Sequence, residues 1–131
     1  MSYRIFPRLT AIVSLCLIAL MPMAASASDH GGGGAPEPLV FTTNAGKNQY
    51  LQFGIILEPA VPEAQHLIAG YKPKIQHEIL LMLADKDVNK LRTLQGKKDL
   101  AEEIIEIVNH VIHEDEKTGV KEVLFTKFLI Q

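Results

Sequence analysis

The C-terminal stretch GVKEVLFTKFLIQ, residues Gly119 to Gln131, decides the fold of this chain. After its glycine it is rich in branched and aromatic residues, which is the composition of a β-strand and not of a loose tail. Burial of one such apolar side chain contributes about 1.5–3 kcal/mol to stability. The apolar side chains are Val123, Leu124, Phe125, Phe128, Leu129 and Ile130. We therefore expect this segment to be paired and packed in the core of a domain.

Two further strands are predicted upstream, at Leu39 to Thr43 and at Gln49 to Glu58. The residues between them, Asn44 to Asn48, include Asn and Gly, which tolerate positive φ, so the two strands should form a hairpin. Every second residue of the longer strand is apolar, which directs one face toward a core. These residues are Leu51, Phe53, Ile55 and Leu57.

A helical pattern begins at Glu63, with apolar residues mostly on one side. They are Leu67, Ile68, Tyr71, Ile75, Ile79, Leu80, Met82 and Leu83. Gly70 and Pro73 interrupt the pattern. This predicts either a bend or a short helix that leads into a longer one, with Pro73 in the first turn of the longer helix.

A connecting helical turn is predicted from Asp85 to Thr93, followed by a second long helix from Gln95 or Gly96 to about His113. The core positions expected in these two segments are Val88, Leu91, Leu100, Ile104, Ile107, Val108 and Val111. The predicted fold class is α+β, with a small antiparallel sheet, made of the hairpin and the C-terminal strand, covered by two long helices.

The outer face of this sheet is predicted to mix apolar and polar residues. Its expected members are Gln52, Ile56, Glu58, Glu122, Leu124, Phe128 and Ile130. One layer of helices would leave this apolar surface exposed, so we expect self-association, giving a homo-oligomer.

The segment before the domain has the layout of a targeting signal. Arg4 and Arg8 precede an apolar run from Leu9 to Met23, and Ala25-Ser26-Ala27 would suit a cleavage site. Residues 1–27 are therefore predicted to be a signal peptide or an N-terminal membrane anchor. Residues 28–38 read as a Gly/Pro linker, and residues 39–131 as the folded domain.

Composition excludes several classes of function. The single cysteine, Cys16, lies in the apolar run, so the exported part has no disulfide and no thiolate site. Without Arg4 and Arg8, eleven basic residues stand against fifteen acidic ones, and the net charge of about −4 disfavours nucleic-acid binding. The glycines Gly31 to Gly34 lack the strand and Lys-Ser/Thr pair of a phosphate loop. We expect no cofactor and a protein partner.

The strongest candidate for chemistry is the set Glu106, His110 and His113, which one helix face could offer to a divalent metal. Alternatively, the two histidines satisfy the last carbonyls of the helix or face solvent, and we expect this arrangement, with no metal. His66 and His77 lie near Glu63 and Glu78, but no serine or cysteine follows in the domain to act as a nucleophile. No catalytic site is therefore predicted.

Charge is distributed unevenly over the predicted helices. The basic residues are Lys72, Lys74, Lys86, Lys90, Arg92, Lys97 and Lys98, and the acidic ones lie in Glu102 to Glu106 and Glu114 to Glu116. Such asymmetry can orient head-to-tail neighbours in an oligomer, or it can reflect solvated helix faces.

Two segments carry a resemblance to a known family. LRTLQGKKDLAEEIIEIVNHVI, from Leu91 to Ile112, followed by GVKEVLFTKFLIQ, resembles the C-terminal half of the FliL family of flagellar basal-body-associated proteins. Both segments occur in the family's order, and the match extends over nearly everything after the linker. The residues that fill the family's closing-strand pattern are Gly119, Val123, Phe125, Thr126, Phe128 and Gln131.

The resemblance implies a non-enzymatic protein of the cell envelope near the flagellar basal body. It implies a single-pass inner-membrane protein whose periplasmic domain is similar to the stomatin-like (SPFH) fold and whose partners are the flagellar motor and its stator units. The very short cytoplasmic tail and the cleavable appearance of the apolar segment depart from this pattern. A soluble periplasmic scaffold or binding module, cleaved after Ala27 and not tied to the flagellum, is the alternative.

Overall fold

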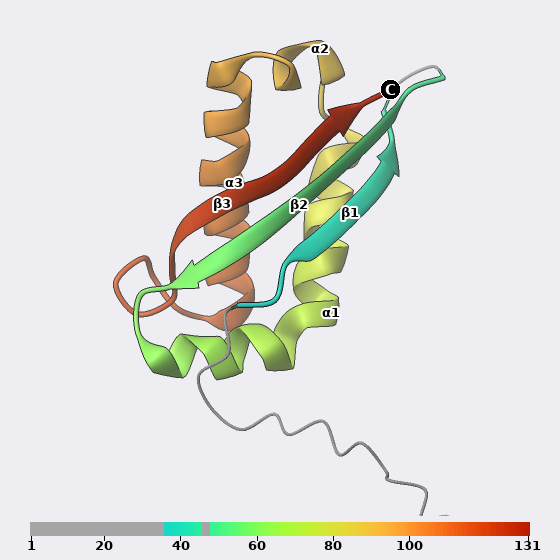
Figure 1. The fold of residues 1–131 in the computed structure, drawn as a ribbon. Helices are drawn as coiled ribbons and strands as arrows, with labels where there is room; N and C mark the ends of the chain where they lie inside the picture. The colour runs from blue at the N-terminus through green and yellow to red at the C-terminus, as the bar shows by residue number, and fades with distance from the viewer. Residues whose placement is uncertain (1–35, 46–47) are drawn as a thin grey trace, which may run out of the picture. The chain divides into compact units, whose positions relative to one another are not determined.

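A computed structural model describes residues 36–45 and 48–131 of the chain. The elements are β1 (Leu39–Asn44), β2 (Tyr50–Pro59), α1 (Pro62–Ala84), α2 (Val88–Leu91), α3 (Leu94–Ile112) and β3 (Val120–Ile130). The strands form one antiparallel sheet in the order β1-β2-β3, with the described helices on one face of it (Figure 1). The α+β prediction is confirmed. The predicted signal or anchor over residues 1–27 lies outside the described residues, as does most of the linker.

The β1–β2 hairpin forms as predicted. Its register runs from Leu39 opposite Ile55 to Asn44 opposite Tyr50, and the backbone N–H of Ala45 donates to the Gln49 carbonyl at 2.7 Å. Asn48 has a φ of 61°, the left-handed conformation that asparagine tolerates better than most residues.

The core lies between the sheet and the two long helices. Leu51, Phe53 and Ile55 of β2 are almost completely buried, and the Phe53 ring stacks on that of Phe41 with 5.0 Å between centroids. The helices contribute to the same cluster, through residues that recur mostly at four-residue spacing. They are Ile75, Ile79 and Leu83 from α1, and Leu100, Ile104, Val108, Val111 and Ile112 from α3.

Helix α1 is continuous and bends along its length (Figure 1). Pro62 occupies the first turn, and Pro73 lies inside the helix, where it has no N–H to donate to the preceding turn. The predicted bend is confirmed, but the placement of Pro73 in a first turn is wrong. The burial of Tyr71 and Leu80 is also wrong. Leu80 points about 100° away from its buried neighbour Ile79, and Tyr71 is 37% exposed.

Thr93 and Gly96 determine how α2 joins α3. The Thr93 hydroxyl donates to the carbonyl of Lys90 at 2.7 Å and accepts from the N–H of Gly96 at 2.9 Å, so one side chain both links the helices and caps α3. A Cβ atom at position 96 would collide with the Lys90 carbonyl. This close approach explains the glycine in the first turn of a helix.

Strand β3 contains a β-bulge at Thr126. Gly54 pairs with Lys127 and Ile55 with Phe125, which leaves Thr126 without a partner on β2. The extra residue places Phe125 and Phe128 on the same, helix-facing side although they are three positions apart. The prediction that Phe128 and Ile130 lie on the outer face is therefore wrong, because the bulge reverses the alternation beyond Thr126.

Candidate protein-contact surfaces

The outer face of the sheet carries exposed apolar side chains from all three strands. Val40 and Tyr50 are more than half exposed, and Leu124 and Leu129 are each 38% exposed. They alternate along the strands with the buried residues, so they belong to the opposite face, and no described helix lies there (Figure 1). An uncovered apolar face of this kind is typical of a surface that another protein covers.

The helix-facing side of β3 is only partly covered. The rings of Phe125 and Phe128 meet edge to face at 5.5 Å, and each also contacts the ring of Phe53, yet both remain half-buried, as does Ile130. The α3 side chains Ala101 and Ile105 are half-buried in the same core cluster. Apolar surface therefore remains accessible between β3 and α3.

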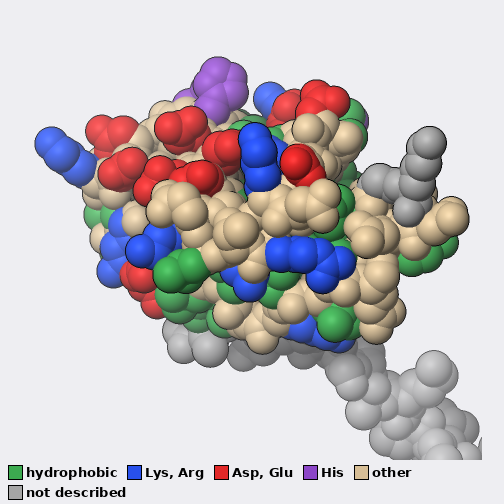
Figure 2. Space-filling view, turned by 90° about the horizontal axis from the view of Figure 1, so that it is seen from above, with side chains coloured by type: hydrophobic (Ala, Val, Ile, Leu, Met, Phe, Trp, Pro, Cys, Tyr) green, Lys and Arg blue, Asp and Glu red, His purple; other side chains and the backbone are tan. Residues whose placement is uncertain are grey.

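One lysine contacts this surface, and two more adjoin it in the sequence. The Lys97 ammonium lies over the Phe128 ring, 5.1 Å from its centroid, in cation–π geometry. Lys98 follows it on α3, and Lys127 precedes Phe128 on β3. None of these three lysines has an ion-pair partner among the described residues. In Figure 2, Asp and Glu (red) lie mainly across the upper part of the view and Lys and Arg (blue) mainly below them, with several of the two kinds side by side.

Two of the basic residues that the sequence singled out are already paired within the domain. Lys72 contacts Glu37 at 3.1 Å, and Lys86 of the α1–α2 connection contacts Glu103 of α3. Charge asymmetry between neighbouring molecules therefore depends on the remaining lysines, among them Lys97 and Lys98.

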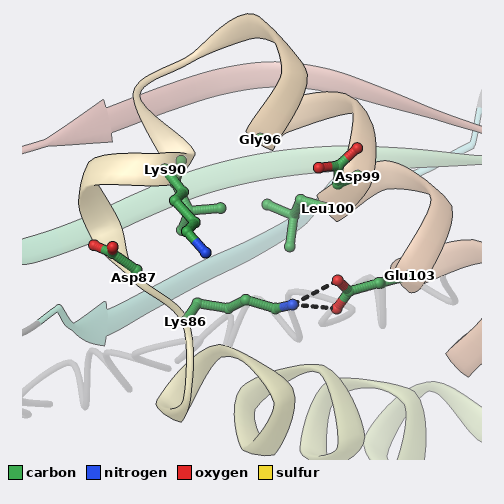
Figure 3. Close-up of a pocket in the computed structure, with 8 residues that line it drawn as sticks. Lys86, Asp87, Lys90, Gly96, Asp99, Leu100 and Glu103 are labelled. Atoms are coloured by element: carbon green, nitrogen blue, oxygen red, sulfur yellow. Dashed lines mark hydrogen bonds and ion pairs between the residues drawn. The ribbon is translucent and has the colours of Figure 1, made fainter.

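A small pocket of about 190 Å³ surrounds the Lys86–Glu103 pair (Figure 3). Lys86 extends across it to the Glu103 carboxylate, and the other lining residues come from α2 with its N-cap and from the first turns of α3. They are Asp87, Lys90, Leu91, Gly96, Asp99 and Leu100. Because its lysine and carboxylate neutralise each other, we assign this pocket a structural role in joining α2 and α3 to α1.

The metal candidates do not form a recognisable centre. Glu106 and His110 are exposed on α3, and His113 caps the helix with a φ of 60°. The ring of His113 meets the ring of Tyr71 edge to face, with centroids 6.3 Å apart. Within residues 36–45 and 48–131, no group of three or more His, Cys, Asp or Glu side chains is arranged to hold a metal ion. His66, His77 and Glu63 are exposed on α1.

Comparison with known proteins places these features in a family. Residues 35–131 match the family described as "Flagellar basal body-associated protein FliL". The chain belongs to the FliL family. The FliL match includes every described helix and strand.

One curated relative has the same family name. The "Flagellar protein FliL" of Aquifex aeolicus (strain VF5) is 30% identical to this chain over 82 residues, which is 63% of this chain and 49% of the relative. This FliL-family chain thus matches about half the length of that relative. In the part that the structure describes, none of the helices combines the length and apolar character needed to cross a bilayer.

The closing pattern of this FliL-family chain combines packing and backbone roles. Val123 is buried, while Thr126 forms the bulge over Gly54, where an added Cβ would lie 2.6 Å from its hydroxyl. Gln131 exchanges two backbone hydrogen bonds with Tyr50, at 2.8 and 2.9 Å. Sequence reasoning selected these positions through the family pattern, and in the structure they take part in the packing and backbone pairing of β3.

Sequence reasoning missed Asn109, whose side chain holds the first residue of β3 in place. It is the one polar residue that is buried among the described residues, and its side chain bonds to the backbone of Val120. A Cβ atom at Gly119 would collide with the Asn109 amide oxygen. The available signal was an asparagine within an otherwise apolar pattern, next to Val108 and near Val111.

Proposed function

We propose that this FliL-family chain is a non-enzymatic accessory protein of the flagellar basal body. In this proposal it supports motor and stator function, and therefore motility, through protein contacts. The observation that carries the proposal is the family match over residues 35–131. The uncovered apolar side chains on both faces of β3 support a role in contact, because they give a partner protein a surface to bury.

The proposal also includes a place and an assembly. The domain lies on the periplasmic side of the inner membrane, held there by residues 1–27 if that segment is retained, and it forms a homo-oligomer. The mass of the mature N-terminus tests the first part, since a chain that starts at Ser28 lacks the anchor. Analytical ultracentrifugation over a wide concentration range tests the second, and a monomer throughout would contradict it.

The function is tested by deleting the gene in a motile strain of its own organism. We expect filaments to assemble, while swimming in soft agar and swarming on firmer agar are reduced. Torque measured on tethered cells separates a motor defect from an assembly defect. Complementation with the chain should restore motility, and complementation with His66→Ala, an exposed α1 variant, should do so equally. Unchanged swimming and swarming after deletion would contradict the flagellar role and favour an envelope scaffold.

A further inference from the structure

The two edges of the sheet differ in how far they are protected. β1 has six residues, and its inward side chains Leu39 and Phe41 are fully packed under the helices. β3 has eleven residues, and its inward side chains Phe125, Phe128 and Ile130 are only half-buried. Long apolar edge strands are places where another strand pairs, and proteins usually shield them. The β3 register has two irregularities, at Lys121 and at Thr126, and between Val123 and Ile130 the strand carries one charged residue, Lys127.

The register shows which backbone groups are free at this edge. The backbones of Tyr50 and Gln131 exchange two hydrogen bonds, and the N–H of Ala45 donates to the carbonyl of Gln49. Because hydrogen bonds alternate along an antiparallel strand, the even-numbered residues of β2 bond to β3 and the odd-numbered residues bond to β1. Residues of β3 that face odd-numbered positions therefore direct their N–H and C=O groups away from β2. Val120, opposite Pro59, is one of them, and its backbone groups bond to Asn109. The others are Val123, Phe125, Phe128 and Ile130, opposite Leu57, Ile55, Phe53 and Leu51.

The same four residues direct their side chains toward α3. An incoming strand would therefore find free hydrogen-bonding groups and half-buried apolar surface together, with Ala101 and Ile105 of α3 beneath its inner side. Leu124 and Leu129 offer apolar surface on the other face of the same strand. Both faces of the edge thus favour an occupant with extended backbone and alternating apolar side chains.

Charge specifies the occupant further. Lys97 lies over the Phe128 ring on the helix-facing side, and Lys127 precedes Phe128 on the outer face, where its Cβ lies 3.9 Å from a Cβ added at Gly54. Neither lysine has an ion-pair partner among the described residues. At the other end of the strand, Lys121 lies 3.8 Å from Glu58, and Glu122 adds a second carboxylate. The end of the edge near Phe128 is therefore basic, and it attracts carboxylates.

We propose that the outer edge of β3, from Val123 to Ile130, binds an extended segment of a partner protein that pairs as an additional strand and places carboxylates next to Lys97 and Lys127. This inference rests on the proposed function, because it assigns the contact by which an accessory protein would act. The docking surface combines outward backbone groups, half-buried phenylalanines, and lysines that have no ion-pair partner in the part of the chain that the structure describes.

The test uses the full chain and a synthetic probe. The probe is a short capped peptide in which valine alternates with threonine, with two aspartates at one end. A control peptide has two lysines in place of the aspartates. Binding is followed by fluorescence anisotropy, and amide hydrogen exchange locates the site. We expect the acidic probe to bind, the lysine probe to bind about tenfold more weakly, and exchange to slow at Phe125 and Phe128.

Matched variants distinguish strand pairing at the β3 edge from nonspecific binding of the probe. Ile130→Pro removes an outward N–H at the β3 edge, whereas Thr42→Pro removes one at the β1 edge. We expect about tenfold weaker probe binding for the first and less than about twofold for the second. The charge reversals Lys97→Glu and Lys127→Glu together should also weaken binding, whereas Lys74→Glu and Lys117→Glu, on exposed sites elsewhere, should not.

Three outcomes would overturn the inference. They are no binding of the acidic probe at millimolar concentration, equal loss from Thr42→Pro and Ile130→Pro, and a chain that dimerises through β3 and excludes the probe. The last outcome would identify a second copy as the occupant. These readouts are independent of motility, so a deletion that leaves swimming unchanged would refute the flagellar role without refuting edge binding.

Discussion

The side-chain amide of Asn109 in α3 exchanges two hydrogen bonds with the backbone of Val120, the first residue of β3. Asn109 Nδ2 donates to the Val120 carbonyl at 2.9 Å, and the Val120 N–H donates to Asn109 Oδ1 at 2.7 Å. The amide thus substitutes for a neighbouring strand at a position where Val120 is fully buried. This contact determines where β3 starts.

Replacing Asn109 should destabilise the domain strongly. In Asn109→Ala both backbone groups of Val120 lose their partners away from water, so we expect the free energy of unfolding to fall by about 2–4 kcal/mol. Urea denaturation followed by circular dichroism measures this change. His110→Ala, on the exposed side of the same turn, should shift the free energy by less than about 0.5 kcal/mol. Equal effects from the two variants would contradict the role of the amide.

The glycines should separate into two classes. Gly119→Ala should lower the free energy of unfolding by about 1–3 kcal/mol, because the new Cβ collides with the Asn109 amide and lies 2.8 Å from the Asp115 carbonyl. Gly70→Ala should instead raise it by up to about 1 kcal/mol, since that Cβ meets nothing within 4 Å and alanine favours a helix. Thermal melts of both variants provide the measurement, and a destabilised Gly70→Ala would show that the bend in α1 needs glycine.

Gly54 and Thr126 should show an interaction across β2 and β3. A Cβ at position 54 would lie 2.6 Å from the Thr126 hydroxyl, so Gly54→Ala should cost about 1–3 kcal/mol in the native sequence. In a Thr126→Ala background this clash is absent, and the cost of Gly54→Ala should be at least halved. A double-mutant cycle in urea measures the difference. Additive effects would mean that the bulge moves to accommodate the new methyl group.

The three phenylalanines of the sheet should differ in their contribution. Phe53 is completely buried, so Phe53→Ala should cost about 3–5 kcal/mol, whereas the half-buried Phe125 and Phe128 should each cost about 2–3 kcal/mol when replaced by alanine. Equilibrium unfolding of the three variants gives the order. A cost for Phe128→Ala as large as that for Phe53→Ala would indicate that the β3 edge is covered in solution.

Asp115 should titrate below its ordinary value. The backbone N–H of Lys117 and the hydroxyl of Thr118 donate to its carboxylate, and they hold the pKa of Asp115 below the usual 3.8. Because the folded pKa is lowered, this contribution to stability is present above the unfolded pKa and is lost as the pH falls through the folded pKa. NMR titration of the carboxyl carbon should show the pKa returning toward 3.8 in Thr118→Val. An unchanged pKa would exclude the hydroxyl as a cause.

The sequence by itself determined the order of the elements, the hairpin, the buried apolar residues of β2 and most of those of α3. These depend on local features: alternation in Leu51 to Leu57, helical spacing from Leu100 to Val111, and a turn that contains Asn48. It also identified the family-pattern residues Gly119 and Thr126, although the pattern alone did not explain them.

Only the tertiary structure decided which faces are covered. The bulge at Thr126 arises from the register of β3 on β2, and it turns Phe128 and Ile130 toward α3. The Asn109–Val120 contact and the exposure of Leu80 likewise depend on how segments far apart in the chain are placed against each other. Periodicity specifies which residues share a face of one element, but it cannot specify what another element places against that face. The pairing and packing of distant segments supply that information, and they leave the edge of β3 open.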